Sequence, residues 1–279
     1  MNYRHRFHAG NFGDVLKHWA LVELLSRLAD LERPLAYLET HAGAGRYALG
    51  EGPGDPDEWR RGIGRLWEAR EPALARYLEL VSQDSPAGAG RPLAYPGSPL
   101  IAARLLGPRD RLLLCELEPE AHAALRALLA DDARAAVHRR DGYEALGALL
   151  PPRERRGLVL IDPPYEARAG EFLRMMPALE RAWRRFPQGC YAIWHPIKTL
   201  PPLNPFRRFL GERAPGPVLE LRLLVRAPDS PLRLNGAGLF LVRPPWRLEE
   251  RLAPGLARLA EALAEGAGAG ASLGWLRAP

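Results

Sequence analysis

Short runs of branched apolar residues alternate along the chain with longer stretches in which apolar residues recur every three or four positions. The first kind is typical of strands and occurs at residues 34–39, 111–115, 136–138, 157–161, 189–194, 218–225, 237–242 and 272–276. The second kind is typical of amphipathic helices and occurs at residues 14–28, 100–106, 119–129, 171–186 and 247–265. Runs without polar alternation indicate strands buried on both faces. The pattern predicts an α/β fold with a mostly parallel, Rossmann-like sheet, and 218–225 with 237–242 as an antiparallel hairpin at its edge.

Residues 47–92 interrupt this alternation. Two amphipathic helices are predicted at residues 56–70 and 72–83, and a Gly, Ala and Ser-rich loop follows them. We expect this segment to form an inserted helical subdomain with its own small core. The chain then divides into an N-terminal arm, first helix and start of the main domain (1–46), the insertion (47–92), and the remainder of the main domain (93–279).

The most informative motif is Asp162-Pro163-Pro164-Tyr165, which directly follows the apolar run 157–161. The carboxyl ends of parallel strands are where open α/β sheets bind their ligands. Asp162 offers a carboxylate, the Asp162 and Pro163 carbonyls offer further acceptors, and Tyr165 offers a flat face. Together they suit a planar ring that carries an amino group. The alternative is a rigid turn, because Asp and Pro are common turn residues.

Three further features lie at predicted strand ends. Residues 40–46 form a Gly-x-Gly loop after the first strand, with spacing shorter than the dinucleotide fingerprint. This spacing disfavours a dehydrogenase and favours a nucleoside ligand such as S-adenosylmethionine. Glu116, at the tip of the next strand, is placed to accept ribose hydroxyls, although a surface carboxylate or helix cap is an alternative. Asp141-Gly142 follows a third strand and is either an ordinary turn or part of an adenine pocket.

The net charge of +6 and a pI near 9.7 favour a polyanionic partner. The only lysines are Lys17 and Lys198, so arginine supplies most of the charge, and compositional drift is the competing explanation. Cys115 and Cys190 lie in apolar runs without paired spacing, which predicts buried free thiols and no zinc site. The N-terminus lacks the apolar segment of a signal peptide, and no run reaches transmembrane length. We expect a cytoplasmic protein with no membrane partner.

The ordered set of glycine loop, acid, Asp-Gly and Asp-Pro-Pro-Tyr resembles class I S-adenosylmethionine-dependent methyltransferases that act on exocyclic amino groups. Within this class, four segments are similar to one family, the bacterial 23S ribosomal RNA adenine-N6 methyltransferases, which have an inserted helical subdomain. The segments are residues 3–18, 40–47, 95–99 and 160–166. The resemblance extends to Asn235-Gly236-Ala237-Gly238 and Pro244-Pro245-Trp246, and is weakest at 47–92 and 200–215.

The resemblance implies a role for each matching residue. S-adenosylmethionine would be bound by His18, His41, Ser98, Glu116, Asp141, Gly142 and Asp162. Asp162, Pro163 and Tyr165 would carry catalysis, and Tyr3, Arg4 and Lys17 would contact the RNA. From its position alone His18 is an ordinary surface histidine, so its role depends on the resemblance. No metal is expected, and the protein is expected to be a monomer that binds 23S rRNA.

Two other functions stay open at this point. A DNA adenine-N6 methyltransferase uses the same Asp-Pro-Pro-Tyr chemistry, but such enzymes usually add a target-recognition domain larger than residues 47–92. A non-catalytic nucleic-acid-binding protein of DNA utilisation would keep a vestigial pocket. The acids at positions 116, 141 and 162 argue against such decay.

Overall fold

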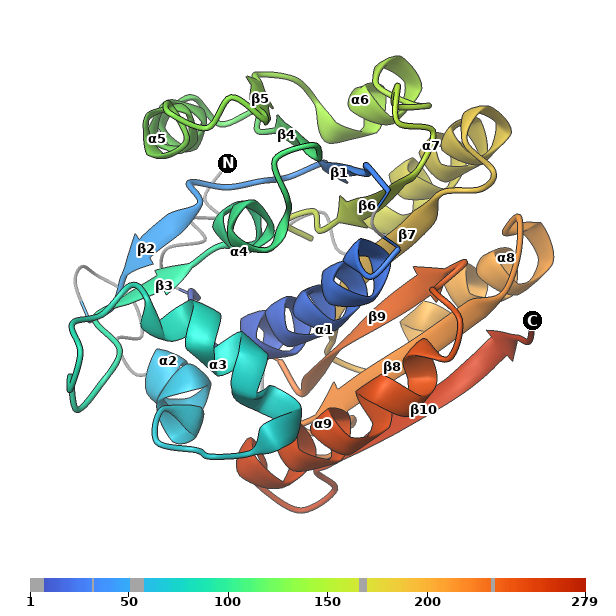
Figure 1. The fold of residues 1–279 in the computed structure, drawn as a ribbon. Coiled ribbons are helices and arrows are strands. Elements are labelled where there is room, and N and C mark those ends of the chain that lie inside the picture. The colour runs from blue at the N-terminus through green and yellow to red at the C-terminus, as the bar shows by residue number, and fades with distance from the viewer. Residues whose placement is uncertain (1–7, 32, 51–57, 166–169, 232–233) are drawn as a thin grey trace.

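The computed structural model describes the chain except for residues 1–7, 32, 51–57, 166–169 and 232–233. Its centre is an eight-stranded sheet in the order β10-β8-β9-β7-β6-β1-β4-β5 (Figure 1). The strands from β7 to β5 in this order are parallel, and β9 is antiparallel to both β7 and β8. Their bounds are β1 (Ala36–Glu39), β4 (Arg111–Cys115), β5 (Ala135–His138), β6 (Gly157–Ile161), β7 (Cys190–Ile197), β8 (Val218–Leu224), β9 (Gly236–Val242) and β10 (Gly270–Arg277).

Helices cover both faces of the sheet, which makes three layers (Figure 1). One face packs against α1 (Phe12–Ala29), α4 (Ser98–Leu105), α5 (Pro119–Leu128) and α9 (Leu248–Ala262). The other face packs against α6 (Gly142–Ala148), α7 (Gly170–Arg185) and α8 (Asn204–Arg213). The β1, β4 and β6 residues are almost all buried, because both sides of these strands contact helices. The predicted α/β fold with a mostly parallel sheet is confirmed, as are the two buried free cysteines.

The predicted edge hairpin is wrong in one respect. β8 and β9 do pair antiparallel, but β9 lies between β8 and β7, and β10 forms the edge by pairing with β8. All seven residues of β9 are buried. Strands that follow one another in the sequence commonly pair, whereas their place in the sheet depends on which apolar surfaces must be covered.

Asp14 and Ser98 stand near the starts of helices, where such residues often act as caps, but their side chains have other partners. Asn11, and not Asp14, caps α1, because its side-chain oxygen accepts hydrogen bonds from the N–H groups of Gly13 and Asp14. Ser98 is the first residue of α4, and its hydroxyl is used elsewhere. Asp14 and Ser98 both direct their side chains to buried polar partners near the carboxyl ends of the strands.

The insertion begins and ends at a two-stranded antiparallel ribbon of β2 (Arg46–Ala48) and β3 (Ala94–Pro96). Between them lie α2 (Glu58–Arg61), three-residue and four-residue 3₁₀ turns, and α3 (Ala75–Ser82), so the predicted helices are shorter and more broken than expected. The apolar side chains of this segment, including Ile63 and Tyr77, belong to the same core cluster as α1. The segment therefore shares the main core instead of forming a separate one. In Figure 1, α2 and α3 lie beside α1.

Candidate active site

The predicted site residues converge at one edge of the sheet, where the parallel strands end. Glu39 at the end of β1 is in register with Leu160 of β6 and Leu114 of β4, so the residues that follow these strands lie side by side. Asp162 follows β6 and Glu116 follows β4. Acidic side chains from three adjacent strands thus face one region above the sheet.

The glycine loop after β1 is held against this acidic edge. Gly43 and Gly45 have φ values of 64° and 78°, which side chains other than glycine rarely allow. The Gly43 N–H donates to one carboxylate oxygen of Glu116 at 2.7 Å, and the Glu118 N–H donates to the other at 2.8 Å. Each oxygen keeps a second lone pair for a further donor. Glu116 therefore fixes the loop and can still accept ligand hydroxyls.

Asp141 and Gly142 begin α6 beside the same loop. One Asp141 carboxylate oxygen caps the helix by accepting from the Tyr143 and Glu144 N–H groups. A Cβ on Gly142 would lie 2.3 Å from the Thr40 carbonyl oxygen, so only glycine allows α6 to approach β1 this closely. The pair therefore forms the start of a helix packed against Thr40, and not an isolated turn.

One histidine, His41, lies within the loop, and another, His18, contacts the β2–β3 ribbon that follows it. His41 contacts the Tyr143 ring edge-on at 5.4 Å, and its Nδ1 is 2.8 Å from the Thr40 hydroxyl. Burial lowers the pKa of His41, which favours a neutral imidazole. His18 of α1 is buried, and its Nδ1 lies 3.0 Å from the Tyr95 hydroxyl. The His18 ring also stacks on Tyr95, so its position is set by the strand that closes the insertion.

Glu39 is a buried acid that sequence reasoning missed. Its carboxylate accepts hydrogen bonds from Ser98 Oγ at 2.5 Å and from the Tyr37 hydroxyl at 2.8 Å. Burial raises the pKa of Glu39 to about 8, against the lowering effect of these hydrogen bonds. The signal in the sequence was a charged residue at the end of an apolar run directly before a glycine loop. Because Ser98 donates its only hydroxyl proton to Glu39, it presents acceptor lone pairs to a ligand.

Lys17, which was predicted to contact RNA, is buried between two carboxylates. Its Nζ lies 2.6 Å from Asp162 Oδ2 and 2.9 Å from Asp14 Oδ1, and only 3% of the residue is exposed. Burial alone would lower the pKa of Lys17, but the carboxylates of Asp14 and Asp162 outweigh it and hold the pKa well above its usual value. A contact with an RNA phosphate would require both ion pairs to break. The geometry favours Lys17 as the group that holds the Asp162 carboxylate in place.

The Asp-Pro-Pro-Tyr segment is rigid at Tyr165. This residue has a φ of 51°, and its hydroxyl donates to the carbonyl oxygen of Trp194 within β7. The Tyr165 ring contacts the rings of Phe172 and Trp194 edge-on at 5.5 and 5.8 Å. Trp194 in turn donates from Nε1 to the Gly13 carbonyl of α1. The aromatic face predicted to stack on a base is therefore anchored to both the sheet and α1.

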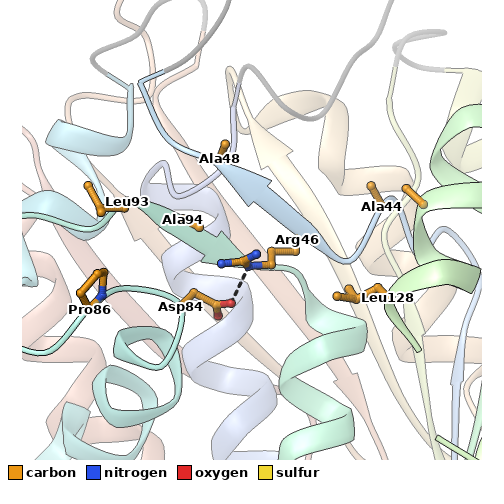
Figure 2. Close-up of a pocket in the computed structure, with 9 residues that line it drawn as sticks. Ala44, Arg46, Ala48, Asp84, Pro86, Leu93, Ala94 and Leu128 are labelled. Atoms are coloured by element: carbon orange, nitrogen blue, oxygen red, sulfur yellow. Dashed lines mark hydrogen bonds and ion pairs between the residues drawn. The ribbon is translucent and has the colours of Figure 1, made fainter. Parts of the chain in front are cut away.

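A separate groove of about 510 Å³ lies between the glycine loop, the β2–β3 ribbon and α5 (Figure 2). Of the predicted site segments only the glycine loop reaches it, through Ala44 and Arg46. Arg46 and Asp84 form an ion pair across it at 2.8 Å. Its other lining residues are Ala48, Pro86, Leu93, Ala94, Ala124 and Leu128. The groove therefore borders the site without containing its acids.

Some predicted features cannot be placed or are absent from the described part of the chain. Tyr3 and Arg4 lie outside the described residues, so their RNA contacts stay predictions. Among the residues that the structure describes, no group of His, Cys, Asp and Glu could hold a metal ion. Within the same residues, no helix has the length and apolar character needed to cross a membrane.

The strand order and the site at the strand ends define a Rossmann-like methyltransferase of class I, with β9 as the antiparallel strand inserted between β7 and β8. The family model "Ribosomal RNA large subunit methyltransferase D, RlmJ" matches residues 32–277, and the chain belongs to this family.

Named relatives and a solved structure agree with this assignment. The chain is 41% identical over 259 residues to ribosomal RNA large subunit methyltransferase J of Haemophilus influenzae, and 39% identical over 256 residues to that of Escherichia coli. Each match covers 90% of both chains. A crystal structure of a Legionella pneumophila protein from the DUF519 family is 33% identical, with a TM-score of 0.85 and coverage of 96% of this chain and 97% of that one. The relatives' names favour the ribosomal RNA hypothesis over the DNA and non-catalytic alternatives.

Proposed function

We propose that the protein transfers a methyl group from S-adenosylmethionine to the exocyclic N6 of one adenine in 23S ribosomal RNA. The observation that carries the proposal is the Asp162 carboxylate, which is held by Lys17 beside a buried Pro163 and an anchored Tyr165. The family assignment supports the reaction type and the RNA substrate.

The residues at the strand ends fit S-adenosylmethionine. Glu116 has free acceptor capacity for ribose hydroxyls, and Asp141 and Gly142 begin a helix next to the glycine loop. Ser98 presents acceptor lone pairs that suit an ammonium group, because its proton is donated to Glu39. His18 and His41 would bound the same space. The cofactor would supply an electrophilic methyl group on a sulfonium centre.

Asp162 and Pro163 would prepare the adenine for attack. The N6 lone pair of adenine is delocalised into the ring and is a poor nucleophile. Two hydrogen bonds from N6–H groups, to the Asp162 carboxylate and the Pro163 carbonyl oxygen, would favour tetrahedral geometry at nitrogen and orient its lone pair. Asp162 would then accept the surplus proton, directly or through water.

Lys17 and Tyr165 would position these groups. Lys17 binds Asp162 Oδ2, which leaves Oδ1 to accept from N6. The Tyr165 ring would stack on a base turned out of its helix, as enzymes that modify a base require. Because the Tyr165 hydroxyl is bonded to the Trp194 carbonyl, the ring would meet the base in one orientation.

Transfer of labelled methyl groups tests the proposal. The protein is incubated with labelled S-adenosylmethionine and either protein-free 23S rRNA or duplex DNA, and the nucleosides are separated. A single N6-methyladenosine peak from the RNA alone is expected. Label in DNA with none in RNA would select the DNA alternative, and cofactor binding without transfer to either would favour a non-catalytic protein.

A further inference from the structure

A basic surface with one exposed tryptophan lies at the edge of the sheet opposite the active site. It is built from three segments that meet at the amino ends of the parallel strands: the turn after α1, the turn before β6, and the turn between β9 and α9. We call it the amino-edge patch and define it as Leu31, Arg33, Arg155, Arg243, Trp246 and Arg247. In Figure 1, β9 ends and α9 begins on the same side of the molecule as the end of α1.

Hydrogen bonds join the three segments into one surface. Arg156, at the start of β6, donates to the carbonyl oxygens of Leu28 and Arg33, the latter at 2.6 Å. Arg27 near the end of α1 donates to the Trp246 carbonyl at 3.4 Å. The turn before β6 and the turn before α9 are therefore both tied to the end of α1.

The patch has cationic groups that the fold does not use. Arg33, Arg155 and Arg243 are exposed, and in the described part of the chain their side chains make no hydrogen bond or ion pair. Three neighbouring acids are already paired. Asp30 binds Arg27 and Arg251, Glu154 binds Arg111 and Arg153, and Glu250 binds Arg247.

The apolar members of the patch are exposed as well. Trp246 is 73% exposed and Leu31 is 57% exposed. Exposed aromatic rings among arginines can stack on unpaired bases while the guanidinium groups bind phosphates. This combination fits single-stranded or looped RNA better than a membrane or an acidic peptide, neither of which offers a flat base to the indole.

Three arginines of the patch also have an unusual backbone conformation. Arg155, Arg243 and Arg247 have φ values of 51°, 53° and 60°, a left-handed conformation that few residues other than glycine adopt. The only other such residue besides glycine in the described chain is Tyr165 of the catalytic segment. At each of these three positions glycine or asparagine would be less strained, yet an arginine is present.

We propose that the amino-edge patch is a second RNA-binding surface, which holds a part of the substrate RNA distant from the methylated adenine. The proposal depends on the proposed RNA substrate. The five residues of β6 alone separate the two edges by about 16 Å at about 3.3 Å per residue. A long RNA can reach both edges, whereas a minimal stem-loop around the adenine reaches only the active site. The patch would supply affinity without choosing the sequence.

The test compares two triple variants on two RNAs. One variant is Arg33→Gln with Arg155→Gln and Arg243→Gln. The matched control, Arg126→Gln with Arg181→Gln and Arg208→Gln, removes the same charge from exposed positions on α5, α7 and α8 that lack ion pairs in the described chain. Dissociation constants for long 23S rRNA and for a minimal stem-loop are measured as a function of salt, together with the methylation rate.

We expect the patch variant to bind long RNA about ten-fold or more weakly than the control variant, with a salt slope lower by about two to three. The methylation rate at saturating stem-loop should not change. Trp246→Ala should weaken long-RNA binding about five-fold or more with little change in salt slope. Equal binding and slope in the patch and control variants would overturn the proposal while leaving the function intact. If the wild-type protein fails to methylate RNA, the proposed function fails, and the binding comparison still decides whether this surface contacts RNA.

Discussion

Replacing Lys17 with methionine separates two roles for this residue, holding Asp162 or binding RNA. The substitution keeps the apolar stem and removes the ammonium group that bridges Asp14 and Asp162. At 2.6 and 2.9 Å, each pair contributes about 6 kcal/mol of Coulomb attraction at an effective dielectric constant of about 20. Desolvation of the buried ions offsets most of this. Removing one partner of a buried pair typically costs about 3–5 kcal/mol, because the remaining charge is uncompensated.

We therefore expect Lys17→Met to lower the free energy of unfolding by about 3 kcal/mol or more and to lower Tm by about 10 °C. The rate of methyl transfer should fall by about 100-fold, because the Asp162 carboxylate loses its fixed position. Affinity for RNA should stay the same. The assays are chemical denaturation, single-turnover methylation and RNA binding as a function of salt.

Asp14→Asn serves as the control for this prediction. It removes one carboxylate from Lys17 but leaves the bond between Lys17 and Asp162 in place, so activity should be retained better than in Lys17→Met. A Lys17→Met protein with unchanged stability and rate, but weaker RNA binding and a salt slope reduced by about one, would refute the reasoning. That result would instead make Lys17 an RNA contact.

Three further predictions concern neighbouring residues. The pKa of Glu39 is raised to about 8, so the unfolded chain loses this proton at a lower pH than the folded protein does. The free energy of unfolding of the wild-type protein should therefore fall as the pH rises from about 4.5 to 8, by up to about 1.4 kcal/mol per pH unit. Glu39→Gln should remove this fall. Denaturation at pH 5 and 8 checks this, and an equal fall in the variant would contradict it. Gly142→Ala should destabilise the protein by about 1–3 kcal/mol in thermal unfolding, because its Cβ meets the Thr40 carbonyl; an unchanged Tm would show that α6 can shift. Tyr165→Phe keeps the ring but loses the bond to Trp194, and should slow methyl transfer about ten-fold with little change in RNA affinity. A normal rate would show that the ring needs no anchor.

The sequence predicted the fold class because the apolar runs of the central strands are continuous, and it predicted the site edge because the motifs follow those runs. Asp162, Glu116 and Asp141 lie where their positions after strands suggested. The position of β9 could not be predicted, because strand order depends on packing between surfaces far apart in the sequence. The insertion showed amphipathic spacing, but nothing in that spacing says which core its apolar face joins.

Pairings over long sequence separations explain the remaining differences. Lys17 lies 145 residues from Asp162, and the sequence offers no sign that the two meet. The same holds for Ser98 and Glu39, which are 59 residues apart. In each case the polar side chains are buried because a partner of complementary charge or hydrogen-bonding capacity comes from another element. Residue types alone suggest candidate site residues. The roles of Lys17 and Glu39 become clear only when their ion-pair and hydrogen-bond partners are known.

Single-turnover methylation of protein-free 23S rRNA by the wild-type protein and by Asp162→Asn tests the central claim most directly. The variant keeps the size of the side chain and one acceptor but loses the carboxylate. With S-adenosylmethionine binding measured in parallel, we predict N6-methyladenosine from the wild-type protein and a rate about 100-fold lower from the variant, with the cofactor still bound. An unchanged rate in Asp162→Asn would contradict the role of Asp162 as the group that orients N6 and receives its proton.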